Sequence, residues 1–201
     1  RGDARNTLRP FLPLLQSFSD DTEFRKFYKE NAATYQEQIA FYRETANIGE
    51  MKKWLDKNFP SSSGYDTYKI VFSPLVAYNQ STTWFESNGF RELQPHVNFP
   101  YPENFTLPVS DDARLLQRGN LLFTEINHGF INPTADGYTQ AIRDAVGDLA
   151  YWRGTAGANN YNSPMATFNE MMNWGLVSLY YVDFAPPADR DALIAANETN
   201  Q

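Results

Sequence analysis

The chain has 201 residues, enough for one folded domain that buries roughly 70% of its unfolded surface. Hydrophobic residues make up 42% of the chain and aromatic residues 15%, which excludes a disordered protein. The formal net charge of −7, without a marked cluster of Lys and Arg, argues against nucleic acid as a partner, and the lack of cysteine excludes disulfides, thiolate metal sites and cysteine nucleophiles.

The sequence predicts a single domain over residues 1–201, because it contains no internal repeat and no long linker. No apolar run reaches the roughly 18 residues that a membrane span needs, so we expect no membrane span. The first five residues resemble the interior of a longer chain, and we expect that a signal segment and an N-terminal region of the full-length protein precede them. The sequence does not determine the oligomeric state.

Two helices are predicted in the first 60 residues. Aromatic and aliphatic residues recur at helical spacing from Asp20 to Glu44, and Asp20 with Glu23 resembles a capping box at the start. A second helix is expected to begin after Asn47, which can cap it together with Glu50. Polar residues and Gly from Asn58 to Gly64 then predict a break.

Strands are predicted in the middle of the chain. Residues 68–72 are rich in β-branched and aromatic side chains, which favours a strand ending before Pro74. Residues 82–85 and 90–97 flank Ser87-Asn88-Gly89, a turn sequence typical of a hairpin. The proline-rich stretch from 95 to 108 is predicted to be a loop.

Three helices are predicted in the rest of the chain. The first runs from Leu115 to Asn132 and should end before Pro133, the second covers 138 to about 152, and the third begins with Ser163 as N-cap and Pro164 in the first turn. Expected apolar positions are Leu122, Ile126 and Phe130 on the first and Phe168, Met172, Leu176 and Leu179 on the third. This order predicts an α+β fold, mainly helical with a small antiparallel sheet.

The candidate chemistry lies in the segment Thr124-Glu125-Ile126-Asn127-His128. In the metallopeptidase motif His-Glu-x-x-His, two histidines on one helical face bind zinc and the glutamate between them activates water. Glu125 and His128 occupy two of these three positions, while Thr124 stands where the first histidine belongs. In the glutamate-liganded, or gluzincin, branch of these enzymes a carboxylate on a later helix completes the site, and Glu170 on the third predicted helix has suitable spacing.

Together these features resemble an uncharacterised secreted bacterial family with a zincin-like domain of unknown function. The resemblance spans roughly Ala4 to Asp183 and includes the aromatic N-terminal helices, the segment 124–128 followed by Gly129-Phe130-Ile131-Asn132-Pro133, and the helix of Glu170. Typical members read His-Glu-Phe-x-His-x-Phe-x-Asn-Pro. The resemblance implies a zincin-like fold, metal ligands at His128 and Glu170, a general base at Glu125, and a secreted, periplasmic or surface-attached location.

Thr124 departs from this family pattern. Loss of one ligand from a three-ligand site should weaken zinc binding severely, since even the loss of an outer partner costs about 10- to 100-fold. We therefore expect a degenerate zincin-like metallopeptidase domain with impaired or lost hydrolysis, whose cleft binds a peptide or a glycan. The alternative is an active metal-dependent peptidase with zinc on His128 and Glu170, completed by His96 or water.

Two further interpretations stay open. Glu125 and Glu170 could form a metal-free carboxylate pair, as in glycosidases, if their carboxyl groups lie about 5 to 9.5 Å apart. Alternatively, Glu125, His128 and Glu170 could be ordinary helix residues, paired within a polar network that includes neighbouring asparagines.

Overall fold

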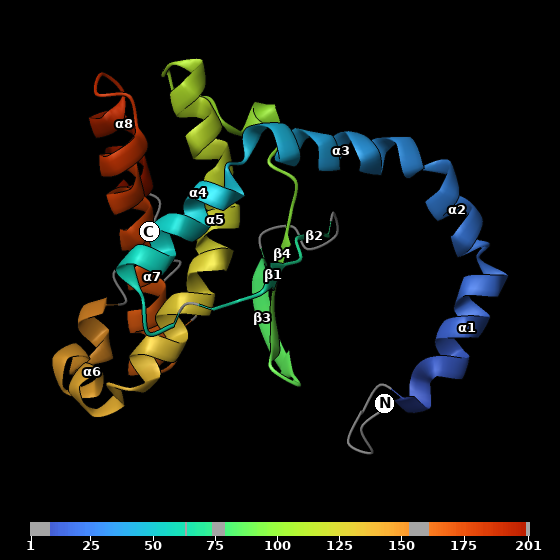
Figure 1. Cartoon of the computed structure of the whole chain (residues 1–201), viewed down its shortest axis with the longest axis horizontal. Helices are drawn as coiled ribbons and strands as arrows, with labels where there is room; N and C mark the ends of the chain where they lie inside the picture. The colour runs from blue at the N-terminus through green and yellow to red at the C-terminus, as the bar shows by residue number, and fades with distance from the viewer. Residues whose placement is uncertain (1–8, 63, 74–78, 153–160, 200–201) are drawn as a thin grey trace. The chain divides into compact units, whose positions relative to one another are not determined.

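The computed structural model describes residues 9–62, 64–73, 79–152 and 161–199 (Figure 1). The chain divides into two compact units, residues 1–45 and residues 46–201. Every residue of the predicted site lies in the second unit, and the expectation of a single domain stays a prediction. No helix among the described residues is long and apolar enough to cross a membrane.

The first unit consists of short helices in succession. A 3-10 turn, Arg9–Phe11, leads into α1 (Leu12–Asp21), followed by α2 (Phe24–Glu30) and α3 (Ala32–Thr45). The predicted single helix from Asp20 to Glu44 is therefore wrong. Glu23 adopts a left-handed φ of 51°, which interrupts the helix, so Asp20 lies in the last turn of α1 and does not cap a new helix.

The second unit begins with α4 (Ile48–Asn58), as predicted. The Asn47 side chain accepts a hydrogen bond of 3.2 Å from the backbone N–H of Glu50, which satisfies one of the free donors of the first turn. Met51, Trp54 and Leu55 are buried, so this helix contributes to the core.

A sheet of four short strands follows: β1 (Thr67–Tyr68), β2 (Val71–Phe72), β3 (Ser81–Ser87) and β4 (Phe90–Val97). The predicted hairpin is confirmed, with Asn88 and Gly89 at positive φ of 52° and 79° in the turn between β3 and β4. The expected antiparallel sheet is wrong in part, because β1 and β2 both pair with β4 in parallel. β1 and β2 pair with β4 in the same register, so they act as one interrupted strand. Because this pairing is parallel, the chain must run back along β3 before it enters β4.

The central helix is α5 (Asp111–Asp136), capped by Ser110, whose hydroxyl accepts from the N–H of Ala113. Its predicted stripe of Leu122, Ile126 and Phe130 is fully buried. The predicted end before Pro133 is wrong. A proline lacks the N–H that would bond the carbonyl four residues earlier, but the Tyr65 hydroxyl donates to that carbonyl, Gly129 O, at 2.9 Å. The helix can therefore continue.

Three helices complete the unit: α6 (Thr139–Val146), α7 (Pro164–Phe184) and α8 (Arg190–Thr199). α6 is shorter than predicted because Gly147, at a φ of 59°, ends it before a 3-10 turn at Leu149–Trp152. Ser163 caps α7 as predicted. Leu176 is buried, but Met172 and Leu179 are 39% and 53% exposed, so the predicted apolar face of α7 is only partly the buried face.

The layers of the second unit place α5 between the sheet and α7 (Figure 1). One face of α5 approaches β4 so closely at Gly129 that a Cβ built there would lie 2.6 Å from a methyl group of Leu93. The opposite side of α5 packs against α7. The structure is thus mainly helical with a small mixed sheet, and the predicted site falls at the contact between α5 and α7.

Candidate polar site between α5 and α7

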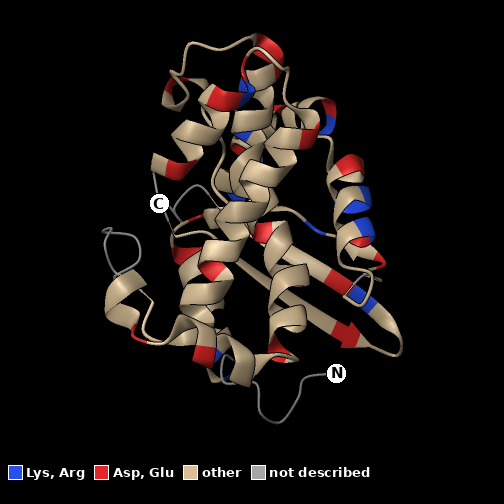
Figure 2. Cartoon of the chain, turned by 90° about the vertical axis from the view of Figure 1, so that its left-hand side faces the viewer, with Lys and Arg blue, Asp and Glu red and all other residues tan. Residues whose placement is uncertain are grey.

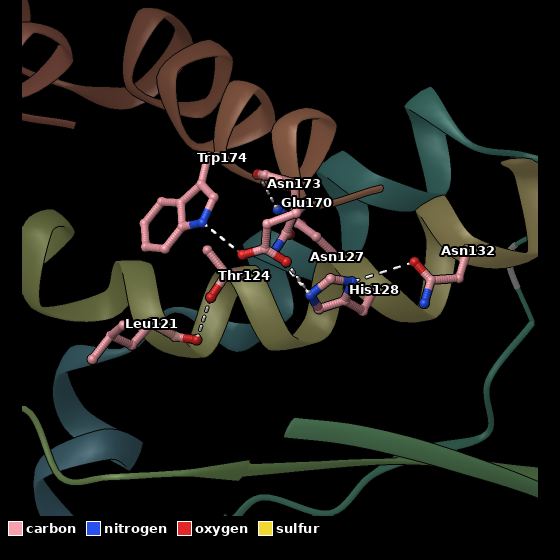
Figure 3. Close-up of polar contacts among 8 residues, drawn as sticks. All are labelled: Leu121, Thr124, Asn127, His128, Asn132, Glu170, Asn173 and Trp174. Carbon is pink, nitrogen blue, oxygen red and sulfur yellow. Dashed lines mark hydrogen bonds and ion pairs between the residues drawn. The ribbon is translucent and has the colours of Figure 1, made fainter. Parts of the chain in front are cut away.

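Helical spacing brings the predicted site residues together. Glu125 and His128 are three residues apart on α5, and Glu170 and Asn173 are three residues apart on α7, so each pair shares one side of its helix. Because α5 and α7 pack side by side, the two pairs face each other (Figure 3). The distance from His128 Nε2 to Glu170 Oε2 is 3.6 Å.

Both ring nitrogens of His128 have amide partners. Nδ1 lies 3.3 Å from Asn132 Oδ1, and the Asn173 side-chain nitrogen lies 3.1 Å from Nε2 (Figure 3). Both ring nitrogens are therefore within hydrogen-bond distance of an asparagine side chain. These contacts hold the imidazole in one orientation.

The Glu170 carboxylate is held by a further donor, because the Trp174 indole N–H donates to Oε1 at 2.8 Å. Tyr161 is also near this carboxylate: burial, followed by the negative charge of Glu170, raises the pKa of the Tyr161 hydroxyl. Glu170 is 18% exposed, as is His128, so both groups can still be reached from solvent.

Glu125 is the most buried acid of the cluster, with 7% of its surface exposed. Burial, followed by the negative charge of Glu170, raises its pKa to about 8. Its Oε2 atom has no hydrogen-bond partner among the described residues. At neutral pH this side chain is therefore mostly the uncharged acid.

Thr124 contributes no group to the cluster. It is 3% exposed, and its hydroxyl donates to the backbone carbonyl of Leu121 at 2.8 Å, within the same helix (Figure 3). The Thr124 hydroxyl is thus hydrogen-bonded within its own helix, at the position where the family pattern has a zinc-binding histidine.

The predicted metal ligands fit a metal only in part. Ligand atoms of a tetrahedral zinc lie about 3.4 Å apart, so His128 Nε2 and Glu170 Oε2 could share one ion if the Asn173 amide moved aside. His96 lies on β4 beside Val71 and Ser81, and no hydrogen bond or ion pair in the described part of the chain joins it to this pair. Across the described residues, no group of three or more His, Asp or Glu side chains is arranged to hold a metal ion.

The chain matches no protein-family model, no curated protein and no solved structure. The zincin-like fold therefore stays a prediction, and functional reasoning depends on the residues of the site itself.

Two features of the site were not predicted. Tyr161 was not singled out, although it lies two residues before the Ser163 cap and hence beside the first turns of α7. The second is the buried link between the helices in which Asn127, fully buried, donates to the backbone carbonyl of Asn173 at 3.4 Å. The asparagines near the site were expected to satisfy buried polar groups, but which groups they contact depends on how α5 and α7 pack.

Proposed function

We propose that this chain is a degenerate zincin-like metallopeptidase domain that has lost efficient zinc-dependent hydrolysis and binds a peptide or a glycan. The observation that carries this proposal is the hydrogen bond from the Thr124 hydroxyl to the Leu121 carbonyl. A threonine is a poor zinc ligand, and here its hydroxyl is both buried and already bonded. Two predicted ligands are left, one fewer than catalytic zinc sites use.

The surroundings of His128 also support a loss of hydrolysis. The Asn173 side-chain nitrogen lies 3.1 Å from Nε2, the ring atom that would have to bind the metal. The partly exposed His128, Glu170 and Trp174 remain as groups that a bound ligand could contact.

Zinc titration of the variant Thr124→His tests this proposal. We expect wild-type protein to bind zinc weakly or not at all in calorimetry, and Thr124→His to gain at least about 100-fold in affinity. Thr124→Val, which keeps the shape of threonine without its hydroxyl, is the matched control and should gain nothing. A second variant, Thr124→His with His128→Ala, should lose the gained affinity if the new histidine acts in the intended site.

Ligand binding is tested separately with peptide and glycan arrays. A ligand of the site should bind wild-type protein and be weakened by Glu170→Gln and Trp174→Phe, which remove the charge and the indole donor. Tight zinc binding by wild-type protein, together with zinc-dependent peptide cleavage, would contradict the proposal.

An active metal-dependent peptidase is the second candidate, favoured by the 3.6 Å separation of His128 Nε2 and Glu170 Oε2. A bound cation beside Glu125 would lower the pKa of that carboxyl and restore it as a base. In this case Glu125→Gln should abolish peptide cleavage while bound metal is retained. His128→Ala should lose both the metal and the activity.

A further inference from the structure

The turn between β3 and β4 carries a chemically reactive pair of residues. It consists of Asn88 and Gly89, both exposed, since Ser87 and Phe90 are the last residues that pair across the hairpin. Asn88 is the only asparagine of the sequence that a glycine follows. Asparagine is among the least durable residue types, because the backbone nitrogen of the next residue can attack its side-chain amide. The turn is therefore a candidate site of covalent modification.

The nitrogen that would attack is not engaged in a hydrogen bond. The pairing of β3 with β4 ends at Ser87 and Phe90, and in the described part of the chain no hydrogen bond involves the Gly89 N–H or the Asn88 side chain. A backbone N–H that donates to an acceptor would have to give up that bond before its nitrogen could react. The Gly89 N–H has no such bond to lose.

The space around the turn leaves the reaction unhindered. A Cβ built on Gly89 would meet no atom within 4 Å, so no other segment of the described chain packs against that side of the residue. Glycine also has no side chain of its own to shield its nitrogen from the neighbouring amide. Asn104 is the opposite case: it is exposed as well, but the bulky Phe105 follows it. The same chemistry should therefore be slow at Asn104.

We propose that Asn88 loses its side-chain amide in the folded protein through a cyclic imide formed with Gly89, and that the products are aspartate and isoaspartate. The Gly89 nitrogen bonds to the Asn88 Cγ atom, the bond from Cγ to Nδ2 breaks, and Nδ2 leaves as ammonia with the proton of the Gly89 N–H. Hydroxide promotes this step because it removes that proton. The proposal is independent of the function proposed for the site between α5 and α7.

Water then opens the imide ring in one of two directions. Attack of water at Cγ breaks the new bond to the Gly89 nitrogen and gives aspartate. Attack at the backbone carbonyl carbon of residue 88 breaks the original peptide bond and gives isoaspartate, in which the chain runs through Cβ and Cγ. The isoaspartate backbone is longer by a carbon atom.

The two products should affect the hairpin differently. Aspartate suits a positive φ in this kind of turn much as asparagine does. Its charge enters a hairpin end that already carries both signs, including the ion pair of Arg91 Nε with Glu86 Oε2 at 3.8 Å (Figure 2). Exposed charges of this kind change stability little. Isoaspartate instead lengthens the turn, so Ser87 and Phe90 can no longer pair as they do across two residues.

Incubation of the full chain at mildly alkaline pH, followed by mass spectrometry of its peptides, tests the reaction. The peptide with residue 88 should change by the mass difference between an amide and an acid and, in water labelled with heavy oxygen, should take up the label. The peptide with Asn104 should stay unchanged. Gly89→Asn is the matched variant, because asparagine tolerates a positive φ better than most residues, while its side chain shields the backbone nitrogen. This variant should lose most of the conversion at residue 88.

The same incubation in urea separates a turn that reacts in the folded state from one that the fold protects. We expect conversion at residue 88 in buffer without urea. Asn88 that converts only in urea, or that converts no faster than Asn104 in buffer, would overturn the proposal.

Hydrogen exchange of residues 81–97 tests the two products. The isoaspartate fraction should exchange faster than wild-type protein, whereas the variant Asn88→Asp should exchange like it. Label-free conversion, or an isoaspartate fraction that is absent while the variant Gly89→Asn reacts as fast as the wild type, would show that no imide with Gly89 forms.

Discussion

Glu125 is an acid that the folded state keeps protonated. Its pKa rises from the ordinary value of 4.5 to about 8 because the side chain is buried and, to a smaller extent, because Glu170 is negatively charged nearby. The folded state therefore binds this proton more tightly than the unfolded state does. The resulting stabilisation is complete below pH 4.5 and is lost as the pH rises towards about 8.

We predict that the stability of the wild-type protein falls between these two pH values by more than that of Glu125→Gln. The glutamine cannot ionise, so the difference between the two proteins should reach several kcal/mol, up to about 5 kcal/mol in favour of the variant above pH 8. Urea unfolding at a series of pH values measures it. Glu170→Gln should reduce the pH dependence without abolishing it, because burial remains. Parallel pH profiles of wild-type and Glu125→Gln protein would contradict this reading.

The Tyr65 hydroxyl compensates for the backbone N–H that Pro133 lacks. The proline lacks the N–H that would bond Gly129 O, and the Tyr65 hydroxyl provides that hydrogen bond from a position 3% exposed. Tyr65→Phe should destabilise the protein by about 1 to 3 kcal/mol, the cost of leaving a buried carbonyl without a partner.

A double-mutant cycle identifies this cause. Pro133→Ala returns an N–H to the helix, so Tyr65→Phe should cost clearly less in that background than in the wild type. The phenylalanine keeps the ring contacts of Tyr65 with Tyr68 and Phe130, which makes the comparison specific for the hydroxyl. Equal costs in the two backgrounds would mean that the hydroxyl does not replace the missing donor.

At the scale of elements, two helical glycines with opposite surroundings provide a matched test. A Cβ at Gly129 would lie 2.6 Å from a methyl group of Leu93, a fully buried residue of β4, whereas a Cβ at Gly175 meets no atom within 4 Å. Gly129→Ala should destabilise by about 1 to 3 kcal/mol, because the buried Leu93 side chain must shift or α5 must move away from β4.

Gly175→Ala should instead stabilise by about 0.5 to 1 kcal/mol, because alanine loses less conformational freedom in a helix than glycine does. Thermal or urea unfolding of both variants gives the comparison. If Gly129→Ala is as stable as Gly175→Ala, the contact between α5 and β4 is less rigid than this packing implies.

Local signals in the sequence predicted the starts of elements better than their ends. Asn47 and Ser163 cap helices as expected because a capping side chain bonds to residues only three positions away. The Asn88-Gly89 turn was also predictable, since its positive φ values suit these two residue types. The continuation of α5 through Pro133 was not, because its cause is a tyrosine 68 residues earlier in the chain.

At the scale of the whole molecule, the two units differ in how much of their helices is buried. α1 and α2 bury no residue, while α5 has a long buried face. Backbone amides of residues 12–30 should therefore exchange with deuterium much faster than those of α5 in dilute protein. Equal protection of residues 12–30 and of α5 would contradict this expectation.

The sequence by itself determined that this chain is mainly helical with a small sheet, and it drew attention to Glu125, His128 and Glu170 by their spacing. These conclusions depend on local periodicity and on which side chains share a helical face. Only the tertiary structure decided what surrounds these groups. The packing of α5 against α7 sets the pKa of Glu125 and gives His128 its amide partner Asn173. Burial and contacts between distant segments have no counterpart in local spacing.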